Sequence, residues 1–423
     1  MTNWAGNVAY AARRLHRPTS LDALRELVTA GARLRVLGSG HSFNRIADTD
    51  GDLVSVAGMP GDIDLDPAAG TVTVPAGIRY GELAVHLHGS GYALHNLASL
   101  PHISVAGACA TGTHGSGDGN PGLAAAVAAM ELVVADGSVV TLRRGDPDFA
   151  GAVVGLGSLG VVTRLTLDVE PAYQMRQFVF DDLPRRSLDA HCAEIFGAAY
   201  SVSVFTDWAA DDRYQVWLKR RTDDARPAPG PRWLGATAAD GPRHPVPGLS
   251  ADPATEQGGV PGPWHARLPH FRLEHTPSSG AELQSEFALP RERAVEALAA
   301  LDDLRGRLSP VVQVSELRTV AADELWLSPA YGRDSVTVHF TWVADLAAVA
   351  PVLAAVEDRL APLGARAHWG KLSGLDPWRG YQRIADFREL TRRYDPAGTF
   401  RNELVDRWLA GAIRPATGSG NSA

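Results

Sequence analysis

Short β-like runs separated by glycine turns fill the first 170 residues, and this pattern constrains the fold more than any other feature. The chain holds 43 glycines in 423 residues, and many of them lie between Gly31 and Gly160. Turns of this kind expose consecutive backbone N–H groups, which suits the binding of a large polar ligand. The predicted strands are residues 33–37, 53–57, 71–74 and 131–134. A hairpin is predicted at Asp136 and Gly137, between two apolar runs.

The first region also contains two predicted helices, and the region after it alternates strands with helices. Helices are predicted over residues 21–30, with Thr19 or Ser20 as the cap and Gly31 as the stop, and over 80–88. The later predicted elements are strands at 201–205, 215–218, 311–314 and 336–342, and helices near 291–307 and 346–360. The sequence therefore predicts an α+β fold, in line with the two domains expected for this length. We expect domains at 1–172 and 173–375, and a final segment at 376–423.

Two stretches stand apart from these elements. Residues 227–263 contain nine of the 28 prolines, so we predict a long surface excursion rather than core. The last ten residues, 414–423, are rich in small and polar residues, and we predict a disordered tail.

Composition excludes several classes of protein. The net charge of −8 argues against a nucleic-acid partner or an anionic membrane surface. Two cysteines, Cys109 and Cys192, are too few for a disulfide framework or a cysteine zinc site. The N-terminus has no signal-peptide pattern, and no apolar run reaches the ~18 residues of a membrane span. We expect a cytoplasmic protein without a metal. A monomer is the expected state, although the sequence leaves the oligomeric state open.

Familiar catalytic motifs are absent or lie in the wrong context. Residues 155–160 (GLGSLG) match the dinucleotide pattern G-x-G-x-x-G, but an alternating β-branched run follows where a helix is required. We predict a tight turn that approaches a ligand. No G-x-S-x-G, H-E-x-x-H or G-K-[ST] motif occurs. The histidines at 86, 88, 95, 102 and 114 could suggest a metal site, but a scattered, largely structural set is favoured.

Two glycine-rich loops are candidates for phosphate binding. Residues 38–43 (GSGHSF) follow a predicted strand directly and form a possible nest of N–H groups, with His41 at its mouth. An ordinary turn with a solvated histidine explains this spacing equally well. Residues 111–119 (TGTHGSGDG) are a second such loop, and the alternative there is a flexible surface segment. Together the loops favour one ligand with two anchor points.

Polar residues interrupt three apolar segments of the second region. Strand alternation places on one face the residues Val312, Val314, Glu316 and Arg318, and on a face of another strand Thr337, His339 and Thr341. Residues 368–371 (HWGK) are the third interruption. Each alone fits a sheet-edge ion pair or a satisfied core histidine. The three together predict a polar pocket for a polyhydroxylated or carbonyl substrate.

These motifs resemble a known family. The segments 38–43, 98–107 (ASLPHISVAG), 111–115 (TGTHG) and 157–163 (GSLGVVT) are similar to those of the vanillyl-alcohol-oxidase flavoproteins. Glu316-x-Arg318, the segment 339–341 (HFT) and the segment 368–371 resemble the branch of this family that oxidises sugar alcohols. The segment 395–398 (DPAG) is also typical, and the resemblance covers about residues 2–405.

The resemblance implies a two-subdomain FAD-binding domain, a cap domain with an antiparallel sheet, and a C-terminal return to the first domain. His41 matches the position that bonds covalently to the flavin. The other positions implied to hold FAD are Val36, Leu37, Gly38, Ser39, Gly40, Ser42, Ser99, Ser104, Gly107, Thr111, Gly112, Thr113, His114, Val162 and His368. The positions implied to bind substrate are Ser99, Glu316, Arg318, Thr341 and Lys371. The implied catalytic positions are Arg318, Lys371, Glu316 and His339.

The implied reaction moves a hydride from a terminal carbinol carbon of xylitol or sorbitol to FAD, with O2 reduced to H2O2. Arg318 and Lys371 could stabilise the developing alkoxide. An aldonolactone oxidase or dehydrogenase is the nearest alternative, because it shares FAD and the Glu-x-Arg pair. Dehydrogenase behaviour also stays open, because one methyl group at Ala98 does not decide oxygen access. A flavin- or carbohydrate-binding protein without turnover would not need the charged groups of the second region.

Overall fold

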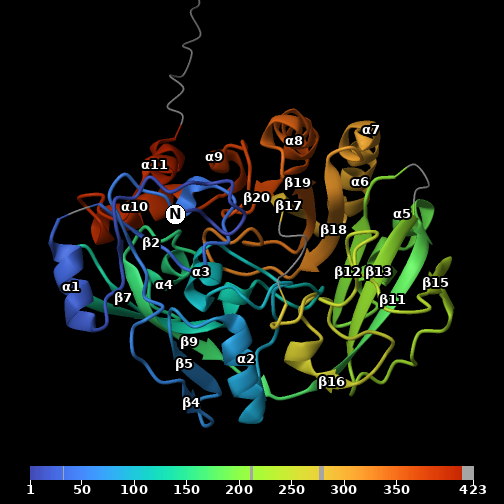
Figure 1. Cartoon of the computed structure of the whole chain (residues 1–423), viewed down its shortest axis with the longest axis horizontal. Helices are drawn as coiled ribbons and strands as arrows, with labels where there is room; N and C mark the ends of the chain where they lie inside the picture. The colour runs from blue at the N-terminus through green and yellow to red at the C-terminus, as the bar shows by residue number, and fades with distance from the viewer. Residues whose placement is uncertain (32, 210–212, 276–280, 412–423) are drawn as a thin grey trace, which may run out of the picture.

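The predicted β-runs of the first region form small layered sheets that helices cover. The computed structural model describes residues 1–31, 33–209, 213–275 and 281–411. Its α-helices are α1 (Leu21–Thr29), α2 (Tyr80–Gly89), α3 (Val105–Ala110), α4 (Phe149–Ala152), α5 (Arg185–Phe196), α6 (Ala294–Asp302), α7 (Arg305–Leu308), α8 (Leu346–Leu360), α9 (Pro377–Gly380), α10 (Ile384–Tyr394) and α11 (Glu403–Ala410). Figure 1 shows their arrangement.

Two sheets organise the N-terminal half. A parallel sheet has the order β1 (Leu15–His16), β3 (Asp52–Val54), β2 (Leu34–Val36), and an antiparallel sheet has the order β4 (Asp64–Asp66), β5 (Thr71–Pro75), β9 (Val161–Asp168), β7 (Val127–Val133), β8 (Val139–Arg143). The predicted hairpin is confirmed, since Val134 N donates to Ser138 O across a turn in which Gly137 has φ +79°. The predicted helices are confirmed as α1, with Ser20 as its cap, and α2.

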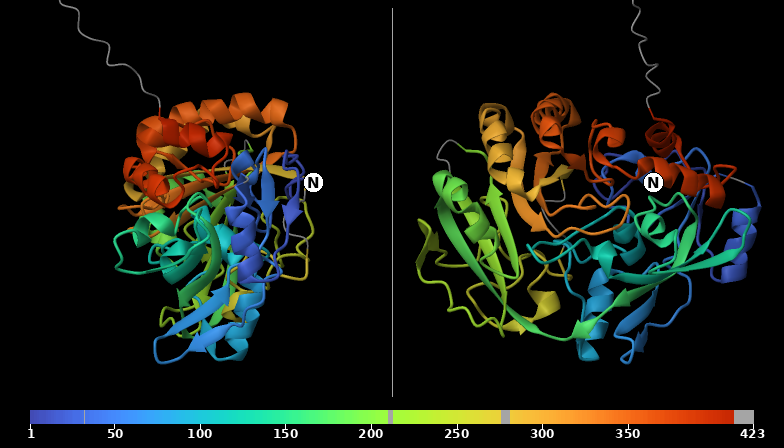
Figure 2. Two further views of the ribbon diagram at one scale, coloured as in Figure 1. Left: turned by 90° about the vertical axis from the view of Figure 1, so that its left-hand side faces the viewer. Right: turned by 180° about the vertical axis from the view of Figure 1, so that it is seen from behind.

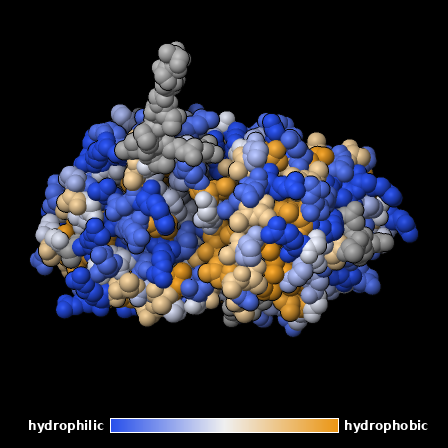
Figure 3. Space-filling model, turned by 90° about the horizontal axis from the view of Figure 1, so that it is seen from above, coloured by the Kyte–Doolittle hydropathy of each residue, from blue (hydrophilic) through white to orange (hydrophobic). Residues whose placement is uncertain are grey.

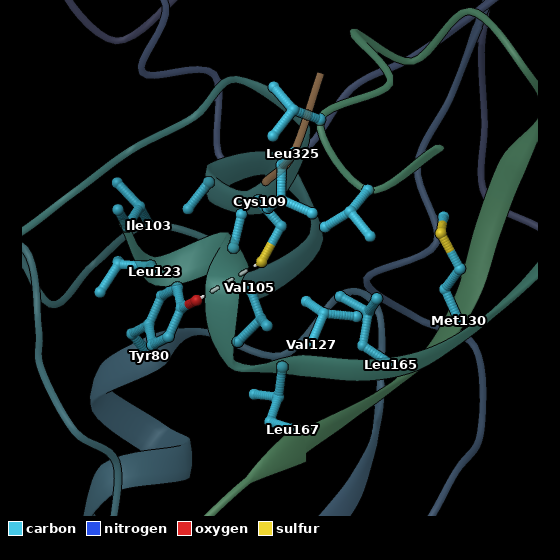
Figure 4. Close-up of a cluster of buried hydrophobic side chains, with 14 of the residues drawn as sticks. Tyr80, Ile103, Val105, Cys109, Leu123, Val127, Met130, Leu165, Leu167 and Leu325 are labelled. Carbon is cyan, nitrogen blue, oxygen red and sulfur yellow. Dashed lines mark hydrogen bonds between the residues drawn. The ribbon is translucent and has the colours of Figure 1, made fainter. Parts of the chain in front are cut away.

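A buried apolar cluster holds helices α2 and α3 on the five-stranded sheet. Figure 4 shows Val127, Leu165 and Leu167 of the sheet facing Val105 and Cys109 of α3. The Tyr80 hydroxyl lies 3.6 Å from the Cys109 sulfur. Leu325, from the loop after β18 of the other half, joins the same cluster. The two halves of the molecule therefore share this core.

The second half is built on one large, mainly antiparallel sheet. Its order is β14 (Arg232–Trp233), β15 (Ala236–Ala238), β11 (Gln174–Pro184), β13 (Arg213–Arg221), β12 (Ser201–Thr206), β18 (Val312–Val320), β19 (Ser335–Val343), β17 (Glu282–Pro290), β20 (Arg366–Ala367), and β16 (Gly262–Pro263) pairs with β11. A two-stranded sheet joins β6 (Tyr92–Ala93) and β10 (Glu170–Pro171). With its antiparallel sheets and covering helices, the chain has the predicted α+β class.

A β-bulge changes the predicted face of one strand. The pairing of β18 with β19 shifts between Val312 and Val314, which inserts one residue into the alternation. Val312 consequently packs in the core under the helices, together with Trp342. Val314, Glu316 and Arg318 point to the other side and line a cavity. The prediction that Val312 shares their face is therefore wrong.

Helices cover one side of the large sheet. Helix α8 has the predicted bounds, and Asp345 caps it by accepting from two backbone N–H groups. The helix predicted near 291–307 is instead broken into a 3-10 turn (Arg291–Arg293), α6 and α7. Leu298 and Leu301 of α6 pack with Val356 of α8 against the sheet. Apolar residues also gather near the middle of the face that carries α8 and α9 (Figure 3).

The proline-rich stretch is not confined to the surface, so that prediction is wrong in part. Val246 and Ala254 are buried in a cluster with Phe205, Trp217 and Val314. Gly259 N donates to the backbone of β11. Regular structure here is limited to the short strands β14, β15 and β16, but the side chains of the stretch still fill one end of the large sheet.

The C-terminal segment packs on the N-terminal half, as the red and blue ribbons of Figure 2 show. The buried Arg35 guanidinium donates to the carbonyl oxygens of Phe400, at 2.6 Å, and of Gly157, at 3.0 Å. Asn402 caps α11 by accepting from Val405 N, and its amide donates to three carbonyl oxygens of residues 45–48. The predicted disordered tail, 414–423, lies outside the described residues.

Asn402→Ala should lower the free energy of unfolding by about 2–4 kcal/mol, because it removes a helix cap and leaves buried carbonyl groups without donors. Ser20→Ala, which removes only the exposed cap of α1, should cost ~1 kcal/mol. Urea denaturation of both variants measures the difference. Equal losses would mean that Asn402 acts only as a cap.

Candidate functional site

A cavity of about 310 Å³ lies where the two halves meet. Its walls include the loop after β2, the start of α3, the turn before β9, and strands β17, β18 and β19. The predicted glycine loops thus face the predicted polar strands across one enclosed space. No prediction from local sequence could establish this, because the segments are up to about 330 residues apart in the chain.

The predicted site residues converge on this cavity. Those that line it are Val36, Leu37, Gly38, Ser39, Gly40, His41, Ser42, Ser99, Ser104, Gly107, Thr111, Thr113, His114, Val162, Glu316, Arg318, His339, Thr341, His368 and Lys371. Gly112 is the exception. It has φ +69°, and a Cβ there would lie 2.8 Å from Pro329, so its role is to turn the chain.

Close packing of backbone explains the glycines of the first loop. A Cβ at Gly38 would lie 2.5 Å from Ser104 Oγ, and Gly40 has φ +71°. The loop therefore runs directly against the start of α3, where Ser104 N donates to Ser39 Oγ at 3.3 Å. Ser104 Oγ is buried without a hydrogen-bond partner. This free hydroxyl on the cavity wall is available to a polar ligand.

His41 presents a free ring nitrogen. Its Nδ1 lies 3.2 Å from Ser39 O, and a carbonyl oxygen can only accept, so Nδ1 carries the proton. The buried Nε2 has no partner. The ring stacks on Trp4 at 5.2 Å. Burial, with a smaller contribution from His102, lowers the pKa of His41 to about 4, so the imidazole is neutral near pH 7. A neutral imidazole with a free lone pair is a nucleophile.

The turn at residues 155–160 approaches the same cavity. Leu156, Gly157 and Gly160 line it, and β9 follows directly at Val161. A Cβ at Gly160 would lie 2.5 Å from Val133 O, which explains that glycine. Both the predicted turn and the absence of a dinucleotide-type helix are confirmed.

The polar end of the cavity is formed by three neighbouring strands. Glu316 pairs with His339 between β18 and β19, and His339 pairs with Glu286 of β17. The same alternation brings Thr341 beside Gln284. Val338, Phe340 and Trp342 point into the opposite core, as predicted.

Glu286 is the residue that sequence reasoning missed. Its buried carboxylate contacts Arg318 Nη2 at 2.6 Å, Lys371 Nζ at 2.6 Å and His114 Nε2 at 3.1 Å. Burial alone would raise the pKa of Glu286, but Lys371 and Arg318 hold it well below its ordinary value. A signal was present, because Glu282, Gln284 and Glu286 alternate along one strand in the same way as Glu316 and Arg318.

Lys371 fixes the hydrogen bonding of His339. Lys371 Nζ lies 2.8 Å from His339 Nδ1, and an ammonium can only donate, so Nδ1 accepts. The proton is then on Nε2, 3.1 Å from Thr341 Oγ1. Burial and the Lys371 charge lower the pKa of His339 to about 4. The imidazole is therefore a neutral, oriented part of the wall.

Further lining residues come from segments with no predicted role. His270 and Phe271 follow the proline-rich stretch, and Pro245 and Val246 lie within it. His270 Nε2 lies 2.7 Å from Glu316 Oε1. No sequence pattern singles out this histidine, because it becomes a partner of Glu316 only through the packing of a long loop on the sheet.

The histidines divide into two groups. His114 and His368 face the cavity, with ring centroids 6.4 Å apart, so the prediction of a largely structural set does not describe His114. His88 packs against His265 at 5.0 Å, away from the cavity. Among the described residues, no group of three His, Cys, Asp or Glu side chains is arranged to hold a metal ion. Within the same residues, no helix has the length and apolar character needed to span a membrane.

Comparison with known proteins gives a consistent result. A family model described as an FAD binding domain matches residues 13–143, and one described as D-arabinono-1,4-lactone oxidase matches residues 281–408. Alditol oxidase of Streptomyces sp. is 52% identical over 97% of this chain and 99% of its own length. The chain belongs to the FAD-linked oxidase family. It is an FAD-dependent oxidoreductase.

Other relatives of this FAD-linked oxidase act on lactones by name. L-gulono-1,4-lactone dehydrogenase of Mycobacterium tuberculosis is 31% identical over 95% of each chain. L-gulonolactone oxidase of Mus musculus is 25% identical over 96% of this chain and 97% of its own. The family-level resemblance inferred from the motifs is thereby confirmed.

Glu286→Gln should lower the free energy of unfolding of this oxidase by about 3–5 kcal/mol at pH 7, because buried cations lose their counter-charge. The folded-state pKa of Glu286 is depressed, so its stabilisation is present above 4.5, its ordinary value, and is lost as pH falls through the folded value. The difference between wild type and variant should therefore shrink in acid. Urea denaturation at several pH values measures it.

Glu324→Gln, at an exposed position, is the control and should change stability by less than ~0.5 kcal/mol at every pH. A constant difference for Glu286→Gln from neutral pH into acid would contradict the assigned charge state.

Proposed function

We propose that the protein is an alditol oxidase, which oxidises the terminal primary alcohol of a polyol such as xylitol or sorbitol to an aldose. The observation that carries the proposal is the polar end of the cavity, where Glu286, Glu316 and Arg318 are buried beside the half-buried Lys371. Buried charges and hydroxyls of this density suit a ligand with many hydroxyl groups. The 52% identity to an alditol oxidase supports the same substrate class.

The domain roles follow from this proposal. Residues 1–172 would form a two-subdomain FAD-binding domain, residues 173–375 a substrate-binding cap, and residues 376–423 a segment returning to the first domain. The match of an FAD-binding model to residues 13–143 supports the first assignment. The contacts of Arg35 and Asn402 with both chain regions support the third.

The lining of the cavity fits FAD. Two buried polar atoms on the wall, Ser104 Oγ and His41 Nε2, lack a protein partner, and a bound dinucleotide would supply one. The residues that would hold it are those implied by the resemblance, with Gly112 shaping the loop. When bound, FAD would supply a hydride acceptor that O2 can reoxidise, giving H2O2. Oxidase rather than dehydrogenase behaviour is part of this proposal.

His41 would hold the flavin covalently. Its neutral ring and free nitrogen support this role, and the stacked Trp4 fixes the plane of the ring. A covalent bond would keep the cofactor in place through repeated turnover.

The other wall would bind and activate the alcohol. Arg318 Nη1 lies 3.4 Å from Ser99 Oγ, so the two reach a common point in the cavity. Arg318 and Lys371 would stabilise negative charge that develops on the reacting oxygen, while Glu316 and Thr341 would orient the remaining hydroxyls. Glu286 and Glu316 balance the two cations, so the site needs no rearrangement of charge before substrate binds.

An aldonolactone oxidase or dehydrogenase is the second candidate. The match of a lactone-oxidase model to residues 281–408 favours it, because these residues supply Glu286, Glu316 and Lys371. The electrostatic arrangement would serve a lactone hydroxyl equally well. In either case we propose a small-molecule substrate, action as a monomer, and a cytoplasmic location.

The visible spectrum of the purified protein tests the proposal directly. Under anaerobic conditions, xylitol or sorbitol should bleach the flavin absorption within the enzyme's turnover time, because no oxidant is available to remove the electrons. L-gulono-1,4-lactone is the matched probe. Bleaching by the lactone alone would replace the alditol proposal with the lactone alternative.

His41→Ala should still bind FAD, because the rest of the wall is unchanged, but acid precipitation should release the yellow cofactor into the supernatant. His102→Ala, a change of a neighbouring histidine that lies outside the lining, should keep a yellow pellet like the wild type. A yellow pellet from His41→Ala would show that the covalent assignment is wrong.

A further inference from the structure

A buried lysine lies behind the wall of the cavity. Lys219 is on β13, between Gln177 of β11 and Ser201 of β12, and its side chain is 1% exposed. Its Nζ donates to Leu268 O at 2.5 Å and to Pro269 O at 3.1 Å, and it lies 3.0 Å from His270 Nδ1. All three donors of the ammonium are therefore used, and all three acceptors are uncharged.

The contacts of His270 with Lys219 and with Glu316 agree on which of its nitrogens carries a proton. An ammonium can only donate, so His270 Nδ1 accepts and Nε2 carries the hydrogen. Nε2 then donates to Glu316 Oε1, 2.7 Å away. Burial, followed by the Lys219 charge, lowers the pKa of His270 to about 4, which keeps the ring neutral. The direction of hydrogen bonding thus runs from Lys219 through His270 to Glu316.

Aromatic packing holds the ring in this orientation. His270 meets the ring of Trp217 edge to face at 5.2 Å and that of Phe205 at 5.5 Å. These contacts prevent the ring from turning without disturbing a buried cluster. His270 therefore presents one N–H group to Glu316 at a fixed angle.

We propose that Lys219 is a positioning residue for substrate binding, acting through His270 to hold Glu316 as an oriented acceptor for a substrate hydroxyl. This inference rests on the function proposed above. Glu316 Oε1 is occupied by His270, and Oε2 lies 3.5 Å from Arg318 Nε, so both ends of the carboxylate are constrained. Lys219 itself does not line the cavity, so its effect on substrate must pass through this chain of hydrogen bonds.

Retention of the ammonium at this position supports a functional role. Burial lowers the pKa of Lys219 to about 7, which shows the cost of holding a charge among neutral acceptors, so the ammonium form that orients His270 predominates below pH 7. An apolar side chain of similar length would fill the same space. The Lys219 charge has one effect that an apolar side chain would lack, which is to fix the His270 imidazole beside Glu316.

The test uses the flavin-loaded enzyme and anaerobic stopped-flow reduction by xylitol, which separates the Kd for substrate from the rate of flavin reduction. Lys219→Met and His270→Phe should each raise Kd about tenfold or more, equivalent to ~1.4 kcal/mol, with a smaller change in the limiting rate. His270→Gln, which keeps an N–H donor toward Glu316, should recover most of the affinity lost in His270→Phe.

Gln177→Leu is the matched control. Gln177 is buried on the neighbouring strand in register with Lys219, and its amide donates to Thr255 O at 3.0 Å. It should lose thermal stability as Lys219→Met does, yet keep the wild-type Kd. If Lys219→Met keeps the wild-type Kd, or if Gln177→Leu raises Kd equally, the positioning role is overturned.

A failure of the proposed function gives a different pattern. If xylitol does not reduce the wild-type flavin and L-gulono-1,4-lactone does, the same variants are compared with the lactone, whose hydroxyls also need an oriented acceptor.

A substrate-independent measurement is ¹⁵N NMR of labelled histidine, with the His270 signal identified by its loss in His270→Gln. The wild type should show an unprotonated Nδ1, and Lys219→Met, which removes the positive charge beside Nδ1, should shift His270 toward the doubly protonated form. A protonated Nδ1 in the wild type contradicts the proposal.

Discussion

The buried carboxylate of Glu286 is the contact on which the polar site depends. Arg318 and Lys371 lie on separate segments, β18 and the loop after β20, and both charges point into the same enclosed space. Two cations this close would repel each other and leave the interior. With Glu286 between them they stay fixed, and Lys371 in turn orients His339. Because water is largely excluded from these charges, each electrostatic interaction among them is stronger than it would be in solution. The charges therefore hold one another in place, and removing one of them destabilises the folded protein.

The two sides of the cavity come from different parts of the fold. The glycine loops bring backbone close to one side of the cavity, since positions such as Gly38 and Gly160 have no room for a side chain. The large sheet supplies the opposite side with charged groups, while its other face is an apolar core under α6 and α8. Arg35 and Asn402 attach the C-terminal segment to the loops near the cavity, so the walls are held from both ends of the chain.

Local sequence patterns predicted a large part of this arrangement. The alternation of side chains along β19 correctly placed His339 and Thr341 on the cavity side, and Val338 and Phe340 in the core. A strand between a core and a cavity must alternate in this way. The prediction failed at Val312, where a bulge inserts one residue, and β17, whose Glu286 is central, is not among the predicted strands. The proline-rich stretch misled for a related reason. Its proline content indicates an irregular backbone conformation, whereas the burial of Val246 depends on contacts with residues that are distant in the sequence.

The sequence by itself determined the α+β class, most strands of the site, the flavin-type loops and the family, because these depend on short-range periodicity and contiguous motifs. Tertiary structure alone decided which polar groups meet. Glu286 with Lys371, His270 with Glu316, and Lys219 with His270 are separated by 46 to 85 residues in the chain. Charge pairing and proton positions depend on distances in space, and only the folded packing sets those distances, as the placement of residues 264–271 against the sheet does for His270.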